Sequence, residues 1–250
     1  MDAIVLAGAL NDGALRAVSS AAYEAEIEIA GKPMVAYVLD TLNRMDEIER
    51  VAVAGYATDN LLRYMTGKVC RVDPGDSMVD SLIKALELLQ SKRPVLVVTS
   101  DIPLITPEAI RDFLVRCQAN PGDVHYSFVS KVQNEARYPG VQRTYVKLRD
   151  GVFTGGNIAL LSPDIVRERI DILKRAASFR KNPVQLCSML GWKYLFKFIF
   201  GLLTIREVED RVSRALGLKA VGIISPYPEV GIDVDKPSDL ELAAKALAQV

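Results

Sequence analysis

Histidine is nearly absent from this chain: His125 is the only one among 250 residues. A lone histidine on an expected strand is more often structural than catalytic, and a histidine-rich metal site needs several imidazoles. We therefore exclude histidine-based catalytic triads and histidine-rich metal sites. Cysteine is scarce too, and Cys70, Cys117 and Cys187 lie far apart, without the close spacing of metal ligands. We expect them to be buried apolar side chains in a reducing compartment. The chemistry must therefore rest on carboxylates, lysines, main-chain amides and a bound metal.

An excess of positive charge is also missing, because 31 basic residues balance 31 acidic ones. Nucleic-acid binders tend to be strongly basic, so we expect no nucleic-acid partner. The first apolar segment begins at residue 3, with no basic segment before it, and a secretory signal is therefore not expected. The composition predicts a cytoplasmic protein whose residues 1–250 form a single domain.

Apolar runs alternate with amphipathic patterns through the first half of the chain. Short apolar runs predict strands, and apolar residues at helical spacing predict helices. Their alternation is typical of βαβ units, and hence of a parallel sheet covered by helices. The expected strands are 3–7, 51–54, 69–72 and 95–98, and the expected helices are 34–44, 58–65, 77–89 and 107–117.

The second half of the chain has a different pattern. Its first strands follow one another without long helices between them, which predicts a mixed or antiparallel edge of the sheet. A helical insertion is expected near residues 163–217. The expected strands are 124–131, 143–148, 157–161, 220–224 and 230–233, and the expected helices are 163–179, 183–216 and 237–248.

Residues 95–104, VLVVTSDIPL, contain the most informative carboxylate. Four apolar residues in a row suit a strand buried on both faces, and ligands of open α/β sheets bind beyond the carboxyl ends of such strands. Asp101 follows this strand directly, so it is either a metal or phosphate ligand or the cap of a turn. Thr106 and Pro107 then predict a helix start.

The loop after the first strand holds Gly8 and Gly13, which have the wrong spacing for the dinucleotide motif G-x-G-x-x-G. No Gly-Lys-Ser/Thr follows, so a P-loop is excluded as well. The loop can still present main-chain N–H groups to phosphates.

Four segments together resemble one family over nearly the whole chain: LAG at 6–8, GKPM at 31–34, SDIPL at 100–104 and GIDVDKPSDLELA at 231–243. This order resembles the MobA-like nucleotidyltransferases of the GT-A (nucleotide-diphospho-sugar transferase) fold. The resemblance implies a Rossmann-like, three-layer α/β/α domain with a mixed, mostly parallel sheet. It also implies transfer of a nucleoside monophosphate from a triphosphate to a phosphorylated acceptor, with release of pyrophosphate.

The resemblance implies roles for individual residues. Asp101, with Asp233 or Asp235, would hold Mg²⁺, and an N-cap is the alternative role for Asp235. Main-chain atoms of Leu6, Ala7, Gly8 and Ala9 would contact the nucleotide, with CTP or GTP favoured. Asp80 and Ser81 would also contact the nucleotide, unless they are simply surface positions of a helix. Gly155, Gly156 and Asn157 would contact the acceptor, unless the glycines only form a bulge before a strand.

The sequence departs from the family pattern in its triphosphate loop. Ala9 stands where a second glycine is usual, and Glu24 stands at the usual lysine position, where it would repel phosphate. Compensating catalytic cations would be Arg16, Lys32 or Lys147, the last leading into an expected glycine-rich turn at 154–157. A glycosyltransferase that uses a nucleotide sugar and a catalytically silent nucleotide-binding protein are therefore the alternative functions.

Residues 186–205 form an apolar stretch of 20 residues with only two charges, Lys193 and Lys197. Its length would span a bilayer, but lysines in mid-segment make a spanning helix unfavourable. The alternatives are a helix packed in the core, a homodimer interface or a membrane-surface helix with basic flanks. The acceptor is accordingly expected to be a phosphorylated small molecule or a lipid phosphate.

Overall fold

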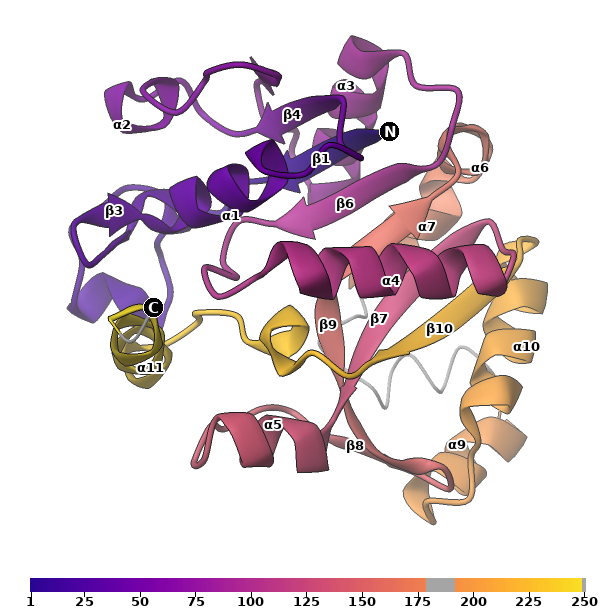
Figure 1. The fold of residues 1–250 in the computed structure, drawn as a ribbon. Coiled ribbons are helices and arrows are strands. Elements are labelled where there is room, and N and C mark those ends of the chain that lie inside the picture. The colour runs from indigo at the N-terminus through magenta and orange to yellow at the C-terminus, as the bar shows by residue number, and fades with distance from the viewer. Residues whose placement is uncertain (179–191, 249–250) are drawn as a thin grey trace.

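The computed structural model describes residues 1–178 and 192–248, and a single large sheet runs through it (Figure 1). The strand order is β10-β7-β9-β6-β1-β4-β5, with β8 paired to β9. Strand β1 pairs in parallel with β4 and β6, whereas β9 runs antiparallel to both β6 and β7. The sheet is therefore mixed and mostly parallel, as predicted. Its strands are β1 (Asp2–Leu6), β4 (Arg50–Ala54), β5 (Val69–Val72), β6 (Val95–Thr99), β7 (Val124–Ser130), β8 (Val146–Leu148), β9 (Gly151–Leu161) and β10 (Ala220–Ser225).

Helices cover both faces of this sheet, which gives the predicted three layers. Side chains alternate along β1, so Ala3 and Val5 face one way and Ile4 the other. Ala3 and Val5 pack in the cluster with α1 (Met34–Asn43) and α4 (Pro107–Ala119). Ile4 packs in the other cluster, which includes residues of α3 (Met78–Leu89), α6 (Pro163–Glu168) and α7 (Ile170–Ser178).

Two helix starts confirm sequence expectations. The Thr106 hydroxyl accepts a hydrogen bond of 3.2 Å from the Ala109 amide, and Pro107 occupies the first turn of α4. Ser77 caps α3 in the same way, accepting 3.1 Å from the Asp80 amide. Capping satisfies amides that have no partner inside a helix, which fixes where each helix begins.

The turn expected at 154–157 is wrong, because these residues lie inside the 11-residue strand β9. A β-bulge instead shifts the register with β7 between Tyr126 and Phe128. A Cβ on Gly156 would lie 2.2 Å from the Ser127 hydroxyl oxygen, so only glycine fits at that point. The glycines therefore allow a close approach of two strands.

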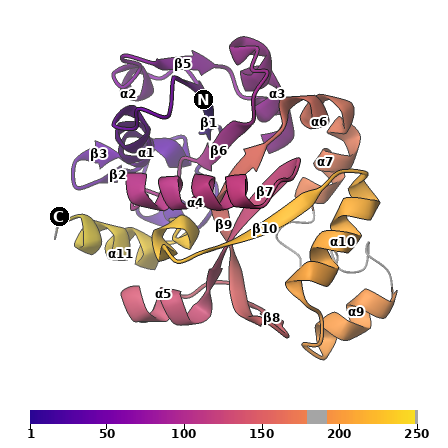
Figure 2. The same cartoon turned by 45° about the vertical axis from the view of Figure 1, so that its right-hand side comes forward.

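Helices dominate the described residues between 163 and 217, namely 163–178 and 192–217, but in shorter pieces than expected. Arg169 separates α6 from α7, and residues 200–204 separate α9 (Trp192–Ile199) from α10 (Ile205–Leu216). Figure 2 shows α9 and α10 beside the β8 end of the sheet. No helix among the described residues is long and apolar enough to cross a membrane. Residues 186–191, including Cys187, lie outside the described part.

The remaining elements include two differences from expectation. The strand expected at 230–233 is wrong: a 3₁₀ turn, η3 (Pro228–Gly231), occupies this region and irregular chain follows it. Helix α5 (Lys131–Arg137) was not expected. The other elements are η1 (Ala14–Ala17), η2 (Glu24–Glu26), β2 (Glu28–Ile29), β3 (Lys32–Pro33), α2 (Asp59–Leu62) and α11 (Pro237–Leu247).

Candidate active site

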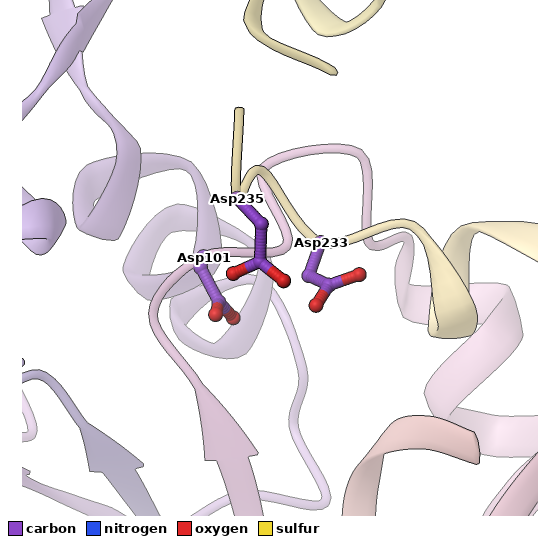
Figure 3. Close-up of side chains that lie close together, drawn as sticks. All are labelled: Asp101, Asp233 and Asp235. Carbon is purple, nitrogen blue, oxygen red and sulfur yellow. The ribbon is translucent and has the colours of Figure 1, made fainter. Parts of the chain in front are cut away.

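Three carboxylates come together at the carboxyl end of β6. Oxygen atoms of Asp101, Asp233 and Asp235 lie within 4.8 Å of one another. Figure 3 shows the three side chains side by side, one from the loop after β6 and two from the irregular segment before α11. Oxygen ligands at this spacing suit a hard divalent cation such as Mg²⁺. The structure thus brings together all three metal-ligand candidates of the sequence.

Main-chain hydrogen bonds hold the two acid-bearing segments against the sheet. The Val234 amide donates to the Asp101 carbonyl at 2.9 Å, and the Ser100 amide donates to the Leu6 carbonyl at 3.1 Å. The Thr99 hydroxyl donates to the Asp101 carboxylate. The carboxylates are therefore positioned by backbone from β1, β6 and the segment after η3.

A buried arginine, Arg143, lies on the inner side of these acids. Its guanidinium donates to the main-chain oxygens of Gly231, at 3.2 Å, and Asp233. It also pairs with the carboxylates of Asp233, at 3.4 Å, and Asp239, at 3.2 Å. Sequence patterns missed this residue. They predicted a strand over 143–148, but β8 begins at Val146, so Arg143 lies in irregular chain and belongs to no motif.

The surroundings of Asp233 perturb the acidity of its carboxyl. Burial raises the pKa of its carboxyl, the nearby Asp101 charge raises it further, and Arg143 only partly opposes them, giving a value of about 7. Two negative charges forced together in a partly dry site disfavour the ionised form. A divalent cation would remove this repulsion, so the donor set fits a metal.

A cleft of about 680 Å³ opens over the acid cluster. The acceptor residues expected from the sequence, Gly155, Gly156 and Asn157, line this cleft together with Asp101. The Asn157 side chain donates to the Val230 carbonyl at 3.4 Å, which links the bulge of β9 to the segment that holds the acids. The other lining residues are Thr99, Tyr126, Gln142, Arg143, Thr144, Val146, Thr154, Asp233, Asp235, Lys236 and Asp239.

The expected nucleotide loop begins beside the cluster, at the carboxyl end of β1. The Ala7 amide donates to the Ala54 carbonyl at 2.8 Å, and the Ala9 carbonyl accepts from the Glu24 amide at 3.0 Å. A Cβ on Gly8 would meet Pro74 at 2.6 Å, so Gly8 allows the loop after β5 to approach. Ala9 is exposed at the tip of this loop.

The expected nucleotide residues Asp80 and Ser81 have partners within the fold. The Ser81 hydroxyl accepts from the Gly75 amide at 2.9 Å and donates to the Ser77 carbonyl at 3.0 Å. Asp80 forms an ion pair of 2.6 Å with Lys174 of α7, and its hydrogen bond from Lys174 lowers the pKa of the carboxyl. Both side chains hold the start of α3, and neither lines the cleft.

The structure places the three expected catalytic cations outside the cleft lining. Lys32 pairs with Asp40 and lies 4.4 Å from the centre of the Tyr37 ring. Arg16 donates to main-chain oxygens of its own loop. Lys147 is exposed and packs along Gly201, because side chains alternate on β8 and its neighbour Val146 faces the cleft.

Lys236 is a cation that does line the cleft. Its ammonium group lies 3.4 Å from the side-chain oxygen of Gln142. The sequence contained a signal for it, since Lys236 directly follows Asp235 in the motif DVDKP.

Comparisons with known proteins identify similar chains. A hypothetical transferase from Thermus thermophilus is 36% identical over 96% of this chain and 98% of that one, with a TM-score of 0.82. At 14% identity, a Francisella tularensis 2-C-methyl-D-erythritol 4-phosphate cytidylyltransferase covers 100% of both chains with a TM-score of 0.63. A CMP:2-keto-3-deoxy-manno-octonic acid synthetase complexed with CTP is 15% identical, with a TM-score of 0.60 and coverage of 100% and 99%.

The last two likenesses show the Rossmann-like fold alone, and no curated protein matches the chain. The model of the MobA-like NTP transferase domain matches residues 13–174, well over half of the sequence. The chain therefore belongs to the MobA-like NTP transferase family, a family of nucleotidyltransferases.

Proposed function

We propose that this protein transfers a nucleoside monophosphate from a nucleoside triphosphate to a phosphorylated acceptor. An acceptor phosphate oxygen forms a bond to the α-phosphorus, and the bond from that phosphorus to the bridging oxygen breaks. The electron pair leaves with pyrophosphate. No covalent enzyme intermediate is needed, because positioning and charge neutralisation supply most of such catalysis.

The observation that carries the proposal is the meeting of Asp101, Asp233 and Asp235 at one edge of the sheet. These carboxylates would hold Mg²⁺, which neutralises charge on the α-phosphate and on the leaving pyrophosphate. They lie between the loop after β1 and the bulge of β9. A nucleotide on one side and an acceptor on the other would therefore meet at the acids.

The chain's own groups supply the binding surfaces. Main-chain atoms of Leu6–Ala9 would contact the nucleotide, with CTP or GTP as the donor. On the acceptor side, Asn157 offers both a donor and an acceptor, and the glycines beside it leave room for a ligand. Lys236 in the cleft supplies a positive charge for phosphate.

The first test combines binding and turnover. Thermal unfolding is followed with CTP, GTP, UTP and ATP, each with and without Mg²⁺, in the wild type, in Asp101→Asn and in the control Asp164→Asn. A nucleotide at one hundred times its dissociation constant adds about 2.7 kcal/mol of stability. We expect Mg²⁺-dependent stabilisation by one nucleotide that is lost only in Asp101→Asn. Pyrophosphate release with candidate phosphorylated acceptors then measures turnover.

Other outcomes point to the alternative functions. Stabilisation by a nucleotide sugar without pyrophosphate release would identify a glycosyltransferase. Binding of a triphosphate with no turnover on any phosphorylated acceptor would favour a catalytically silent nucleotide-binding protein. Absence of stabilisation by every triphosphate would overturn the nucleotidyltransferase proposal.

An exposed apolar surface supports a lipid phosphate among the acceptor classes. Phe196, Ile199, Phe200 and Leu202 are 55% to 65% exposed around the end of α9. Arg149 is exposed and lies between β8 and β9. Its main-chain amide donates a hydrogen bond of 2.9 Å to the Leu203 carbonyl, close to these apolar residues in the chain. An apolar surface with a cation near it favours contact with an anionic membrane surface.

Vesicle flotation tests this membrane contact. Wild-type protein should float with vesicles containing anionic lipid, and the double variant Phe196→Ser/Phe200→Ser should not. The control Val115→Ser changes an exposed apolar residue on α4 and should float like the wild type. Loss of a concentration-dependent dimer in the double variant, with no flotation of the wild type, would assign this surface to a second copy instead.

A further inference from the structure

We infer that Arg143 is a positioning residue that sets the cation affinity of the acid cluster. The inference deepens the proposed function and rests on it, because it concerns the same cleft. The side chain of Arg143 is only 7% exposed, so it has little contact with water although it lines the cleft. A buried guanidinium is tolerated only where its donors are satisfied, and this one is satisfied mainly by the acid-bearing segment.

The contacts of Arg143 span that segment from end to end. Nε donates to the Gly231 carbonyl at 3.2 Å, and a terminal nitrogen donates to the Asp233 carbonyl. The other terminal nitrogen lies 3.2 Å from the carboxylate of Asp239, in the first turn of α11. One rigid, planar group thus ties η3, Asp233 and α11 together. A lysine ammonium has the charge but not this fork of donors.

A second contact relays the arrangement to Asp235. The buried Asp239 carboxylate, held by Arg143, also accepts from the Asp235 amide at 3.3 Å. The main-chain positions of both Asp233 and Asp235 are therefore fixed by groups that Arg143 joins. Asp101 is held separately through Val234.

Arg143 also connects the acids to another part of the cleft lining. Its neighbours Gln142 and Thr144 line the cleft, and the Gln142 side chain lies 3.4 Å from Lys236. The segment that carries the cleft wall and the segment that carries the acids are thereby joined at two points. Loss of Arg143 should loosen both.

Two roles for Arg143 predict effects of opposite sign on cation binding. As a mere positive charge beside the acids, it would repel a dication, and its removal would tighten binding. As a positioning residue, it keeps the carboxylates together, and its removal would weaken binding. The direction of the change therefore separates the two roles.

The experiment measures Mn²⁺ binding to the substrate-free protein, from the paramagnetic resonance signal of free Mn²⁺. The variants are Arg143→Met and the charge-conserving Arg143→Lys. The matched control is Arg50→Met, which removes another arginine from a buried carboxylate, Asp2, on β1. All are measured well below their unfolding temperatures, with circular dichroism to confirm folding.

We expect at least fivefold weaker Mn²⁺ binding in both Arg143 variants and less than a twofold change in Arg50→Met. Unchanged or tighter binding in a folded Arg143 variant would overturn the inference. Where Arg143→Met does not fold, Arg143→Lys decides alone. If the wild-type protein binds Mn²⁺ but releases no pyrophosphate, the proposed function is contradicted. The comparison of Mn²⁺ affinities between the variants still tests the role of Arg143.

Discussion

The Val234 amide donates a hydrogen bond of 2.9 Å to the Asp101 carbonyl, joining two segments that are distant in the sequence. Asp233 and Asp235 flank Val234, so this single bond brings both of them to Asp101. The buried Val234 side chain packs in a cluster with α11, which anchors the segment from its other face. The acid cluster is therefore a product of backbone pairing and core packing.

Electrostatic repulsion between the carboxylates of this cluster predicts that the stability of the metal-free protein depends on pH. The pKa of Asp233 is raised to about 7 by burial and by Asp101. The folded state then binds more protons than the unfolded state, so stability falls as pH rises from about 4 to 7. Asp233→Asn removes this loss and should be more stable than the wild type at pH 8, by about 1 kcal/mol or about 2 °C in Tm.

Calorimetry in the presence of a chelator measures this difference. Asp164→Asn, which changes an exposed aspartate on α6, is the control and should match the wild type. Added Mg²⁺ should stabilise the wild type but not Asp233→Asn. If Asp233→Asn is less stable than the wild type at pH 8, ionisation of Asp233 does not destabilise the folded protein.

Two lysines near the cleft should differ sharply in their contribution to activity. Lys236 lines the cleft, whereas the exposed Lys147 points along Gly201 and away from it. A charge-assisted contact to phosphate contributes about 1.5–3 kcal/mol. Lys236→Met should therefore raise a substrate KM at least tenfold, and Lys147→Met should change kcat/KM less than threefold. Steady-state pyrophosphate release measures both, and equal effects would contradict the cleft assignment.

The sequence located Asp101 correctly because a buried strand leaves a strong local signal. Four consecutive apolar residues identify β6, and its carboxyl end is a place defined by the fold. Helix starts at Ser77 and Thr106 were equally predictable, because capping is a local interaction.

The other parts of the candidate site depend on contacts between distant segments, which local sequence patterns do not indicate. The sequence predicted a strand at 230–233, but η3 and irregular chain occupy this region, and the Val234 amide brings Asp233 and Asp235 to Asp101. Arg143 lies in irregular chain and acquires its role only when the chain folds back on it. The structure places the Lys147 side chain beside Gly201 and outside the cleft lining, and nothing in the sequence indicates which face of β8 meets the cleft.

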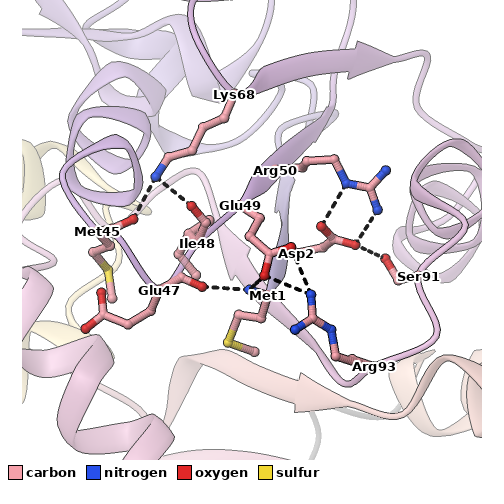
Figure 4. A network of polar contacts seen from close by, with 10 residues as sticks. All are labelled: Met1, Asp2, Met45, Glu47, Ile48, Glu49, Arg50, Lys68, Ser91 and Arg93. Atoms are coloured by element: carbon pink, nitrogen blue, oxygen red, sulfur yellow. Dashed lines mark hydrogen bonds and ion pairs between the residues drawn. The ribbon is translucent and has the colours of Figure 1, made fainter.

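A polar network at the start of the chain predicts acid lability (Figure 4). Arg50 binds both carboxylate oxygens of the buried Asp2, at 3.0 and 2.7 Å, and Ser91 donates to the same carboxylate. Burial acts to raise the pKa of Asp2, but the hydrogen bonds from Arg50 and Ser91 outweigh it and lower the pKa. The resulting stability is present at neutral pH and is lost as pH falls below the ordinary range of an aspartate.

Asp2→Asn should therefore destabilise the protein by about 2 kcal/mol at pH 7, and by less at pH 3. Urea unfolding at both pH values measures the difference. The control is Asp73→Asn, which removes an exposed ion pair with Arg71 and should cost less than about 0.5 kcal/mol. A pH-independent effect of Asp2→Asn would mean that packing, and not charge, stabilises this end of β1.

The bulge of β9 gives the last prediction, since it brings the expected acceptor residues into the cleft. A Cβ at Gly156 would lie 2.2 Å from the Ser127 hydroxyl oxygen and 2.9 Å from the Val230 side chain. Val230 directly precedes Gly231, whose carbonyl accepts a hydrogen bond from Arg143. Gly156→Ala must displace one of these neighbours, and overpacking of this kind costs about 1–3 kcal/mol.

The displacement would also move Asn157 and the chain that leads to Asp233. We therefore expect Gly156→Ala to lower kcat/KM for the acceptor at least tenfold, while thermal stabilisation by the nucleotide changes less. Gly13→Ala is the matched control, because the nearest atom to a Cβ there is 3.9 Å away and the change should be nearly neutral. If Gly156→Ala has the wild-type kcat/KM for the acceptor, the acceptor does not bind against β9, and other residues of the cleft must bind it.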